Sequence, residues 1–214
     1  MPIQTNYIDE LANTIYFELN DAEPVVDQYH LSRYDIVNLC GGIPAPTITS
    51  IRVIMHATYT SAISVRVFSD QYEVVRNMDF QIGRIDNNHM VVAQPGQGLG
   101  TNLFLTQVRS ARDHHFKRLH MTALTPDDER NWTGYYFWAE LGYENTDTDE
   151  FHAWAVEMGR DELTLSELVQ SASGRQLWRQ TGFTWIGNFY LTDDHPCMAY
   201  LLQHLQRQGI DFDL

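Results

Sequence analysis

The stretch Gln94–Gly100, with the sequence QPGQGLG, places three glycines at alternate positions between two different hydrophobic patterns. The apolar run Met90–Ala93 just before it predicts a buried strand. In residues 99–112, just after it, apolar residues recur at helical spacing and predict a helix. Glycine adopts positive φ angles readily, and the start of a helix leaves unpaired N–H groups that carry a partial positive charge. The stretch therefore predicts a cradle for a phosphate or pyrophosphate, or alternatively a tight turn that binds nothing.

The glycine spacing, G-x-G-x-G, differs from the dinucleotide pattern G-x-G-x-x-G and lacks the lysine of the P-loop. It resembles the pyrophosphate loop of the GNAT superfamily, the coenzyme-A-dependent N-acetyltransferases, which reads Arg/Gln-x-x-Gly-x-Gly/Ala between a strand and a helix. In this register Gly98 and Gly100 are in place. Pro95 stands where Arg or Gln is usual, and Gln94 lies one residue early.

A second stretch, Asn131–Tyr143, resembles the fourth-helix signature of the same superfamily. Its matching positions are Asn131, Gly134, Phe137, Leu141, Gly142 and Tyr143. Between the two motifs, Arg118–Leu124 alternates in polarity and predicts the intervening strand. The resemblance covers about residues 50–145, and both the order and the spacing of the elements agree with it.

The resemblance implies a mixed α/β fold, in which helices flank a central, largely antiparallel twisted sheet. We expect the whole chain, residues 1–214, to form a single GNAT-like domain. Its core would be residues 50–145, and residues 146–214 would be a helical C-terminal extension packed on that core.

The resemblance also implies that acetyl-CoA binds as co-substrate. Residues expected to contact the pantetheine arm and the pyrophosphate through their backbones are Val91, Val92, Ala93, Gly96, Gln97, Gly98, Leu99, Gly100 and Thr101. Residues expected at the thiol end are Asn131, Phe137 and Trp138.

The expected catalytic groups depart from the pattern of the superfamily. Trp138 occupies the position of the usual tyrosine acid, and an indole has no useful acidity. Tyr135 or Tyr136 is the alternative acid, because both lie within one helical turn of that position. Asp86 is the candidate base, with His89 and Asp79 as alternatives. Another alternative is that a water chain removes the amine proton, without a strong protein base.

These residues predict transfer of an acetyl or other acyl group from acetyl-CoA to an amine, either a small molecule or a peptide. One alternative is a GNAT-fold protein that binds coenzyme A or another anion as a sensor or interaction module, without catalysis. Pro95 and Trp138 favour it, because each replaces a typical functional residue. Another alternative is an interaction protein whose glycine loop binds nothing.

The net charge of −14, with Lys117 as the single lysine, argues against nucleic acid or an anionic membrane surface as a partner. An acidic surface suits a cationic amine substrate or, alternatively, simply keeps the protein in solution. Cys40 and Cys197 form no disulfide framework, so we expect packing roles for both and a cytoplasmic location. No H-E-x-x-H or C-x-x-C pattern occurs, and the sequence predicts no metal site. A homodimer is one possible assembly.

Along the rest of the chain, residues 5–20 predict a helix, and alternating residues from 48 to 82 predict an antiparallel meander. Turns are expected at 69–71 and 86–88. Helices are expected at 151–158, 163–179 and 198–208, with a strand or loop at 183–191.

Overall fold

In the computed structural model, the residues described are 16–42, 48–56, 61–125 and 134–212. The chain divides into two compact units, residues 1–117 and 118–214. This boundary falls inside the segment expected to form one core, and the single-domain organisation stays a prediction. Among the described residues, no helix has the length and apolar character needed to cross a bilayer.

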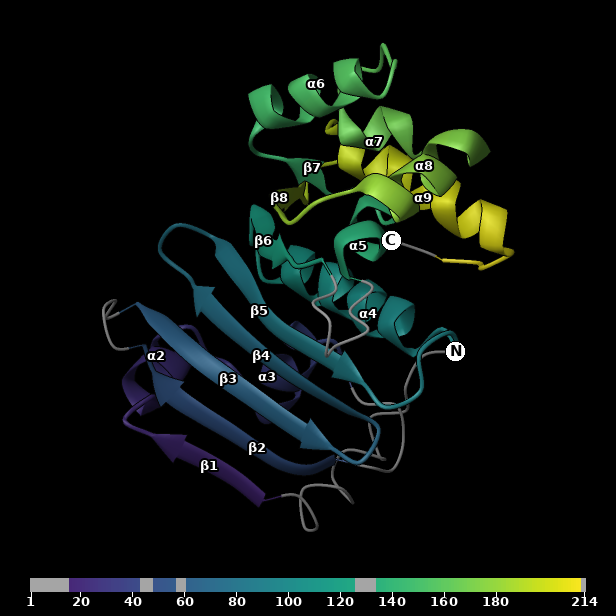
Figure 1. Ribbon diagram of the computed structural model, residues 1–214. Helices are drawn as coiled ribbons and strands as arrows, with labels where there is room; N and C mark the ends of the chain where they lie inside the picture. The colour runs from purple at the N-terminus through teal and green to yellow at the C-terminus, as the bar shows by residue number, and fades with distance from the viewer. Residues whose placement is uncertain (1–15, 43–47, 57–60, 126–133, 213–214) are drawn as a thin grey trace. The chain divides into compact units, whose positions relative to one another are not determined.

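The described part of the first unit contains a sheet with the strand order β1-β2-β3-β4-β5 (Figure 1). Its strands are β1 (Tyr16–Asn20), β2 (Ile48–Met55), β3 (Ala62–Ser69), β4 (Tyr72–Asp79) and β5 (Arg84–Val92). β1 pairs with β2 in parallel, and every later neighbour in this unit is antiparallel. The expected meander is therefore confirmed.

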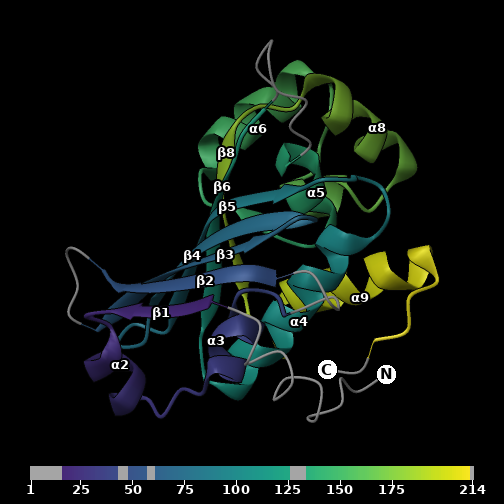
Figure 2. The ribbon, with the colours of Figure 1, turned by 90° about the horizontal axis from the view of Figure 1, so that it is seen from below.

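Three helices accompany this sheet: α2 (Glu23–Gln28), α3 (Arg33–Leu39) and α4 (Leu99–Asp113). Figure 2 shows them on one side of the strands. Side chains on that face are apolar and buried, such as Val65 and Val74. The opposite face carries ion pairs such as Arg66–Glu73. This alternation is typical of an antiparallel sheet with one covered face.

A buried polar network fixes α4 against the sheet. The Gln107 side chain of α4 donates from Nε2 to the Leu39 carbonyl at the end of α3, at 3.0 Å. It also exchanges hydrogen bonds with the Asn87 side chain of β5, at 2.9 and 3.0 Å. Because buried polar groups need partners, this network specifies how α4 is placed on β5.

The second unit contains a smaller antiparallel sheet in the order β6-β8-β7. Its strands are β6 (Arg118–Ala123), β7 (Glu144–Asn145) and β8 (Trp185–Tyr190). The helices are α5 (Gly134–Glu140), α6 (Thr148–Glu157), α7 (Leu165–Leu168), α8 (Ala172–Thr181) and α9 (Pro196–Gln208). The mixed α/β fold class, with a largely antiparallel sheet flanked by helices, is confirmed.

Aromatic rings fill the core of the second unit around Trp178, which is completely buried. The Trp154 ring meets it edge-on, with 4.9 Å between ring centroids, and the Phe183 ring lies at 5.2 Å. Edge-to-face aromatic packing of this kind contributes energy beyond the area buried.

Three predictions of secondary structure are wrong. In the described part of residues 5–20 the chain is strand β1, because pairing with β2 overrides the local helical pattern. Residues 86–88 lie inside β5, and the turn falls at residues 80–83 instead. The expected helix over 163–179 is interrupted, because the Ser171 side chain caps the start of α8 at Gly174 N.

Gly142 explains the Gly-aromatic ending of the fourth-helix motif. Its φ of +95° is left-handed, and a β-carbon there would lie 2.7 Å from the Cys197 carbonyl oxygen of α9. The residue therefore permits both the turn after α5 and the close approach of α9.

We expect Gly142→Ala to lower the free energy of unfolding by about 3 kcal/mol or more, because backbone strain and a backbone clash add together. Gly209→Ala is the matched control, since Gly209 also has a positive φ, of +67°, but has nothing within 4 Å of a β-carbon. It should cost only the strain, about 1 kcal/mol. Equal losses in urea denaturation would contradict this account of Gly142.

Candidate functional site

The glycine loop lies between β5 and α4, as the sequence predicts. Gly96 and Gly98 both have left-handed backbones, with φ of +85° and +78°. A β-carbon on either would meet no atom within 4 Å, so no packing against the described residues calls for glycine at these positions. Left-handed turns favour glycine, and the open space beside both residues leaves the loop accessible to a ligand.

The start of α4 has the properties of an anion site. Gly98 is its N-cap and supplies no side-chain hydrogen bond, and the first turn carries no acidic residue. The first helical hydrogen bond runs from Asn102 N to Gly98 O, at 3.0 Å. Helical geometry leaves the N–H groups of the preceding residues, including Gly100 and Thr101, without an intrahelical acceptor. Those groups and the helix dipole favour a phosphate there.

The end of β5 departs from the prediction of a buried strand. Val91 is 46% exposed, and Ala93 is exposed as well. Ala93 N donates to Gln71 O at 2.7 Å, on the β4 side. Backbone groups alternate in direction along a strand, so those of Val92 face the edge away from β4. The prediction failed because a short apolar run does not reveal what covers it.

A β-bulge interrupts β5 just before this end. Val75 pairs with His89 and Arg76 with Asn87, so Asn88 is the extra residue. The Arg76 guanidinium, only 2% exposed, donates to the His89 carbonyl at 2.7 Å. Bulges bend a strand and increase its twist, and this one redirects the segment that leads to the glycine loop.

The candidate bases are engaged in structural contacts. Asp86 lies within β5 and contacts Arg84, with Arg84 Nη2 donating to Asp86 Oδ2 at 3.1 Å. The Asp79 carboxylate accepts hydrogen bonds from the Gln81 and Ile82 backbones and caps the β4–β5 turn. His89 is half-buried in the bulge. These contacts give Asp86 and Asp79 structural roles, and the role of Asp86 as a base stays a prediction.

Tyr135 is the structural centre of α5. Its hydroxyl donates to the Arg179 carbonyl of α8, and burial, followed by the neighbouring Tyr136, raises the pKa of the phenol. Its own carbonyl accepts from both Trp178 Nε1, at 3.1 Å, and Trp185 Nε1, at 2.7 Å. A hydroxyl that donates to a backbone carbonyl is not positioned to protonate a leaving group.

Tyr136 is the other candidate acid. It is half-buried, and the Arg179 guanidinium lies 4.7 Å from the centre of its ring. Arg179 also donates to the buried Glu140 carboxylate at 2.6 Å, which fixes the cation. His204 lies 4.0 Å from that carboxylate, and burial lowers the pKa of its imidazole.

The residues expected at the thiol end have different surroundings. Trp138 is buried and packs edge-on against Tyr143, with 5.3 Å between centroids. Phe137 is half-buried and contacts the Trp138 ring. Asn131 lies outside the described residues. Trp138 therefore has a core-packing role, and a contact with the cofactor stays a prediction.

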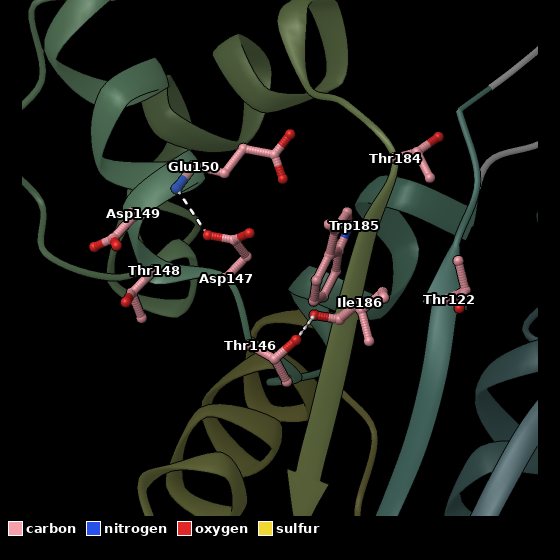
Figure 3. A pocket seen from close by; sticks show the side chains of 9 residues that line it. All are labelled: Thr122, Thr146, Asp147, Thr148, Asp149, Glu150, Thr184, Trp185 and Ile186. Carbon is pink, nitrogen blue, oxygen red and sulfur yellow. Dashed lines mark hydrogen bonds between the residues drawn. The ribbon is translucent and has the colours of Figure 1, made fainter.

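The second unit also contains a pocket of about 520 Å³ that the sequence does not indicate (Figure 3). Its lining residues are Thr122, Thr146, Asp147, Thr148, Asp149, Glu150, Thr184, Trp185 and Ile186. Carboxylates at the start of α6 form one wall and the Trp185 ring of β8 forms another (Figure 3). The acidic run 147–150 was the available signal, but only pairing of β7 with β8 brings it beside Trp185.

No protein-family model matches the chain. No curated protein matches it either. Among solved structures, the chain is similar to the crystal structure of nourseothricin acetyltransferase, with a TM-score of 0.33 and 14% sequence identity. The match covers 59% of this chain and 62% of that protein, so more than a third of that protein has no counterpart in the match.

We expect Tyr135→Phe to lower the free energy of unfolding by about 0.5–1.5 kcal/mol, because the partly buried hydrogen bond from its hydroxyl to the Arg179 carbonyl is lost. Tyr136→Phe is the matched control on the same helix and should change stability by less than about 0.5 kcal/mol. Chemical denaturation measures both. A Tyr135→Phe protein as stable as the parent would remove the structural role assigned to this hydroxyl.

Proposed function

We propose that this protein binds an acyl-coenzyme A and transfers its acyl group to an amine. The observation that carries the proposal is the glycine loop at the uncapped start of α4. Its left-handed glycines are open to ligand, and no acidic side chain lies in the first turn. Coenzyme A suits this loop because its pyrophosphate is a dianion that backbone N–H groups and a helix dipole can hold.

The end of β5 supports the same ligand. The pantetheine arm carries amides, which pair with backbone groups as a strand does. The backbone groups of Val92 face the edge away from β4, and they are the ones we assign to this pairing. Gly96, Gln97, Gly98, Leu99, Gly100 and Thr101 are the residues we assign to the pyrophosphate.

In the proposed reaction, a neutral amine attacks the thioester carbonyl, and a C–N bond forms as the C–S bond breaks. The amine loses a proton, and the coenzyme A thiolate gains one. Tyr136 is the residue we assign to protonate the thiolate, since the Tyr135 hydroxyl is bound to Arg179 O. Water accepts the amine proton, because Asp86 is paired with Arg84.

An amine is the proposed acceptor class because the protein is acidic and a protonated amine is a cation. The protein has 28 acidic against 14 basic residues. The pocket of the second unit combines the exposed carboxylates of Asp147, Asp149 and Glu150 with the Trp185 ring. Carboxylates attract a protonated amine, and the Trp185 ring, which is 2% exposed, lines the pocket beside them.

A second candidate function is binding of coenzyme A without transfer. The specific observation in its favour is that the Tyr135 hydroxyl, the Asp86 carboxylate and the Trp138 ring are all occupied by structural contacts. Under this proposal the glycine loop is a sensor for the cofactor.

Isothermal titration of acetyl-CoA tests the shared part of both proposals. We expect micromolar binding, about −8 kcal/mol, and at least a tenfold loss in Gly98→Trp, whose side chain would fill the loop. Gly159→Trp is the matched control, because Gly159 also has a positive φ, of +67°, with nothing within 4 Å of a β-carbon. No heat at millimolar acetyl-CoA would overturn cofactor binding and leave the loop as a turn.

Release of free thiol in the presence of an amine panel separates the two functions. If the protein is a transferase, we expect Tyr136→Phe to lower kcat by about 100-fold, because general acid catalysis contributes at least that much. The KM for acetyl-CoA should stay unchanged. Asp86→Asn is the comparison and should change kcat less than threefold. Tight binding with no thiol release on any amine would favour the sensor.

A further inference from the structure

Three side chains with metal-binding chemistry converge in the second unit, apart from the residues assigned above. They are Glu144 in β7, His195 at the N-cap of α9 and Cys197 in the first turn of α9. One ligand atom from each lies within 4.8 Å of the other two. We propose that Glu144, His195 and Cys197 form a zinc site with three protein ligands and one open position.

The spacing is that of ligands rather than of hydrogen-bonded partners. His195 Nε2 and Glu144 Oε2 are 3.8 Å apart, too far for a hydrogen bond. Zinc bonds of 2.0–2.3 Å in a tetrahedron separate two ligand atoms by about 3.3–3.8 Å. Nitrogen and oxygen ligands of zinc lie about 3.3–3.6 Å apart, so the imidazole–carboxylate pair must close by a few tenths of an ångström, and the Cys197 sulfur must move by roughly 1.3 Å at most.

Strand β8 holds the three ligands in place. Asn188 pairs with Glu144 across the sheet, and its carbonyl accepts a weak contact from Cys197 Sγ at 3.9 Å. The Tyr190 ring lies against the His195 imidazole, with 4.2 Å between centroids. One strand therefore orients all three ligands, which come from two elements. Metal sites need such surrounding contacts to hold their ligands in the coordination geometry.

The charges and ligand types fit zinc. A thiolate, a carboxylate and a neutral imidazole bring a charge of −2, which balances Zn²⁺, and sulfur, nitrogen and oxygen are its usual donors. The Glu144 and His195 side chains are each 28% exposed, which opens a path for the cation. Cys197 is buried, so its proton must be displaced by the metal, as coordination of a thiol does.

His195 can bind through Nε2 at little cost. Its Nδ1 accepts only a long 3.4 Å hydrogen bond from Cys197 N at the helix start. Ligation through Nε2 places the ring proton on Nδ1, and that bond is then given up. The spacing His195-Pro196-Cys197 is the local sequence signal, but the third ligand lies some fifty residues earlier, and pairing in the sheet brings it near.

Metal content and cobalt spectroscopy test this site in the full-length protein. Metal-free protein given Zn²⁺ and then dialysed should retain one zinc per chain. With Co²⁺ it should show a sulfur-to-cobalt charge-transfer band in the near ultraviolet. Cys197→Ser should abolish the band, whereas Cys40→Ser, which changes a buried cysteine in the first unit, should keep it.

His195→Asn and Glu144→Gln decide the matter if Cys197→Ser does not fold. Asparagine preserves a helix N-cap, and glutamine preserves the size of glutamate, so both variants should fold. Each should weaken zinc binding by about 100-fold. A parent protein that retains no zinc, or variants that bind as tightly as the parent, would overturn the proposal and leave an ordinary His195–Glu144 ion pair. Neither result depends on acetyl-CoA binding.

Discussion

The buried hydrogen bonds of Gln107 are the constraint on which the first unit depends. One side chain joins α4, the end of α3 and strand β5, and it does so where no water can replace a lost partner. A shift of α4 by one residue would leave several of these groups unsatisfied. The glycine loop is the direct connection between β5 and α4, so its geometry follows from this fixed relation.

The second unit is organised around one backbone carbonyl. Tyr135 O accepts two indole N–H groups, and its side chain reaches back to α8. Trp178 and Trp185 can be buried only because this carbonyl satisfies their polar edges. A residue that first suggests catalysis, a tyrosine in the helix of an acetyltransferase-like motif, thus holds the core together.

The residues proposed to bind the cofactor and those expected to transfer protons differ in their hydrogen bonding. At the start of α4, helix geometry leaves backbone donors without an intrahelical acceptor, and the first turn carries no acidic residue. Asp86 and Tyr135, the candidates for proton transfer, are already engaged in structural contacts. The proposed anion cradle therefore rests on the geometry of the glycine loop, whereas the proposed proton transfer falls to Tyr136. The zinc site proposed at Cys197 is independent of both.

The sequence alone predicted those features that depend on local geometry. The alternation from 48 to 82 predicted the meander, and the glycines of 94–100 predicted a strand-to-helix loop. Both signals depend only on residues that are neighbours in the sequence, because alternation sets which face a side chain occupies and glycine permits positive φ angles. The hairpin at 69–71 and the helix from Leu99 were predicted for the same reason.

Features that depend on distant partners were decided only by the tertiary structure. Strand β1 exists because β2 lies beside it, and the end of β5 is exposed although its residues are apolar. The Tyr135 hydroxyl is engaged because α8 presents the Arg179 carbonyl to it. Glu144 lies near Cys197 because both contact Asn188 of β8. Pattern reports which residues can pack or bind, but contact between segments far apart in the chain determines which of them do.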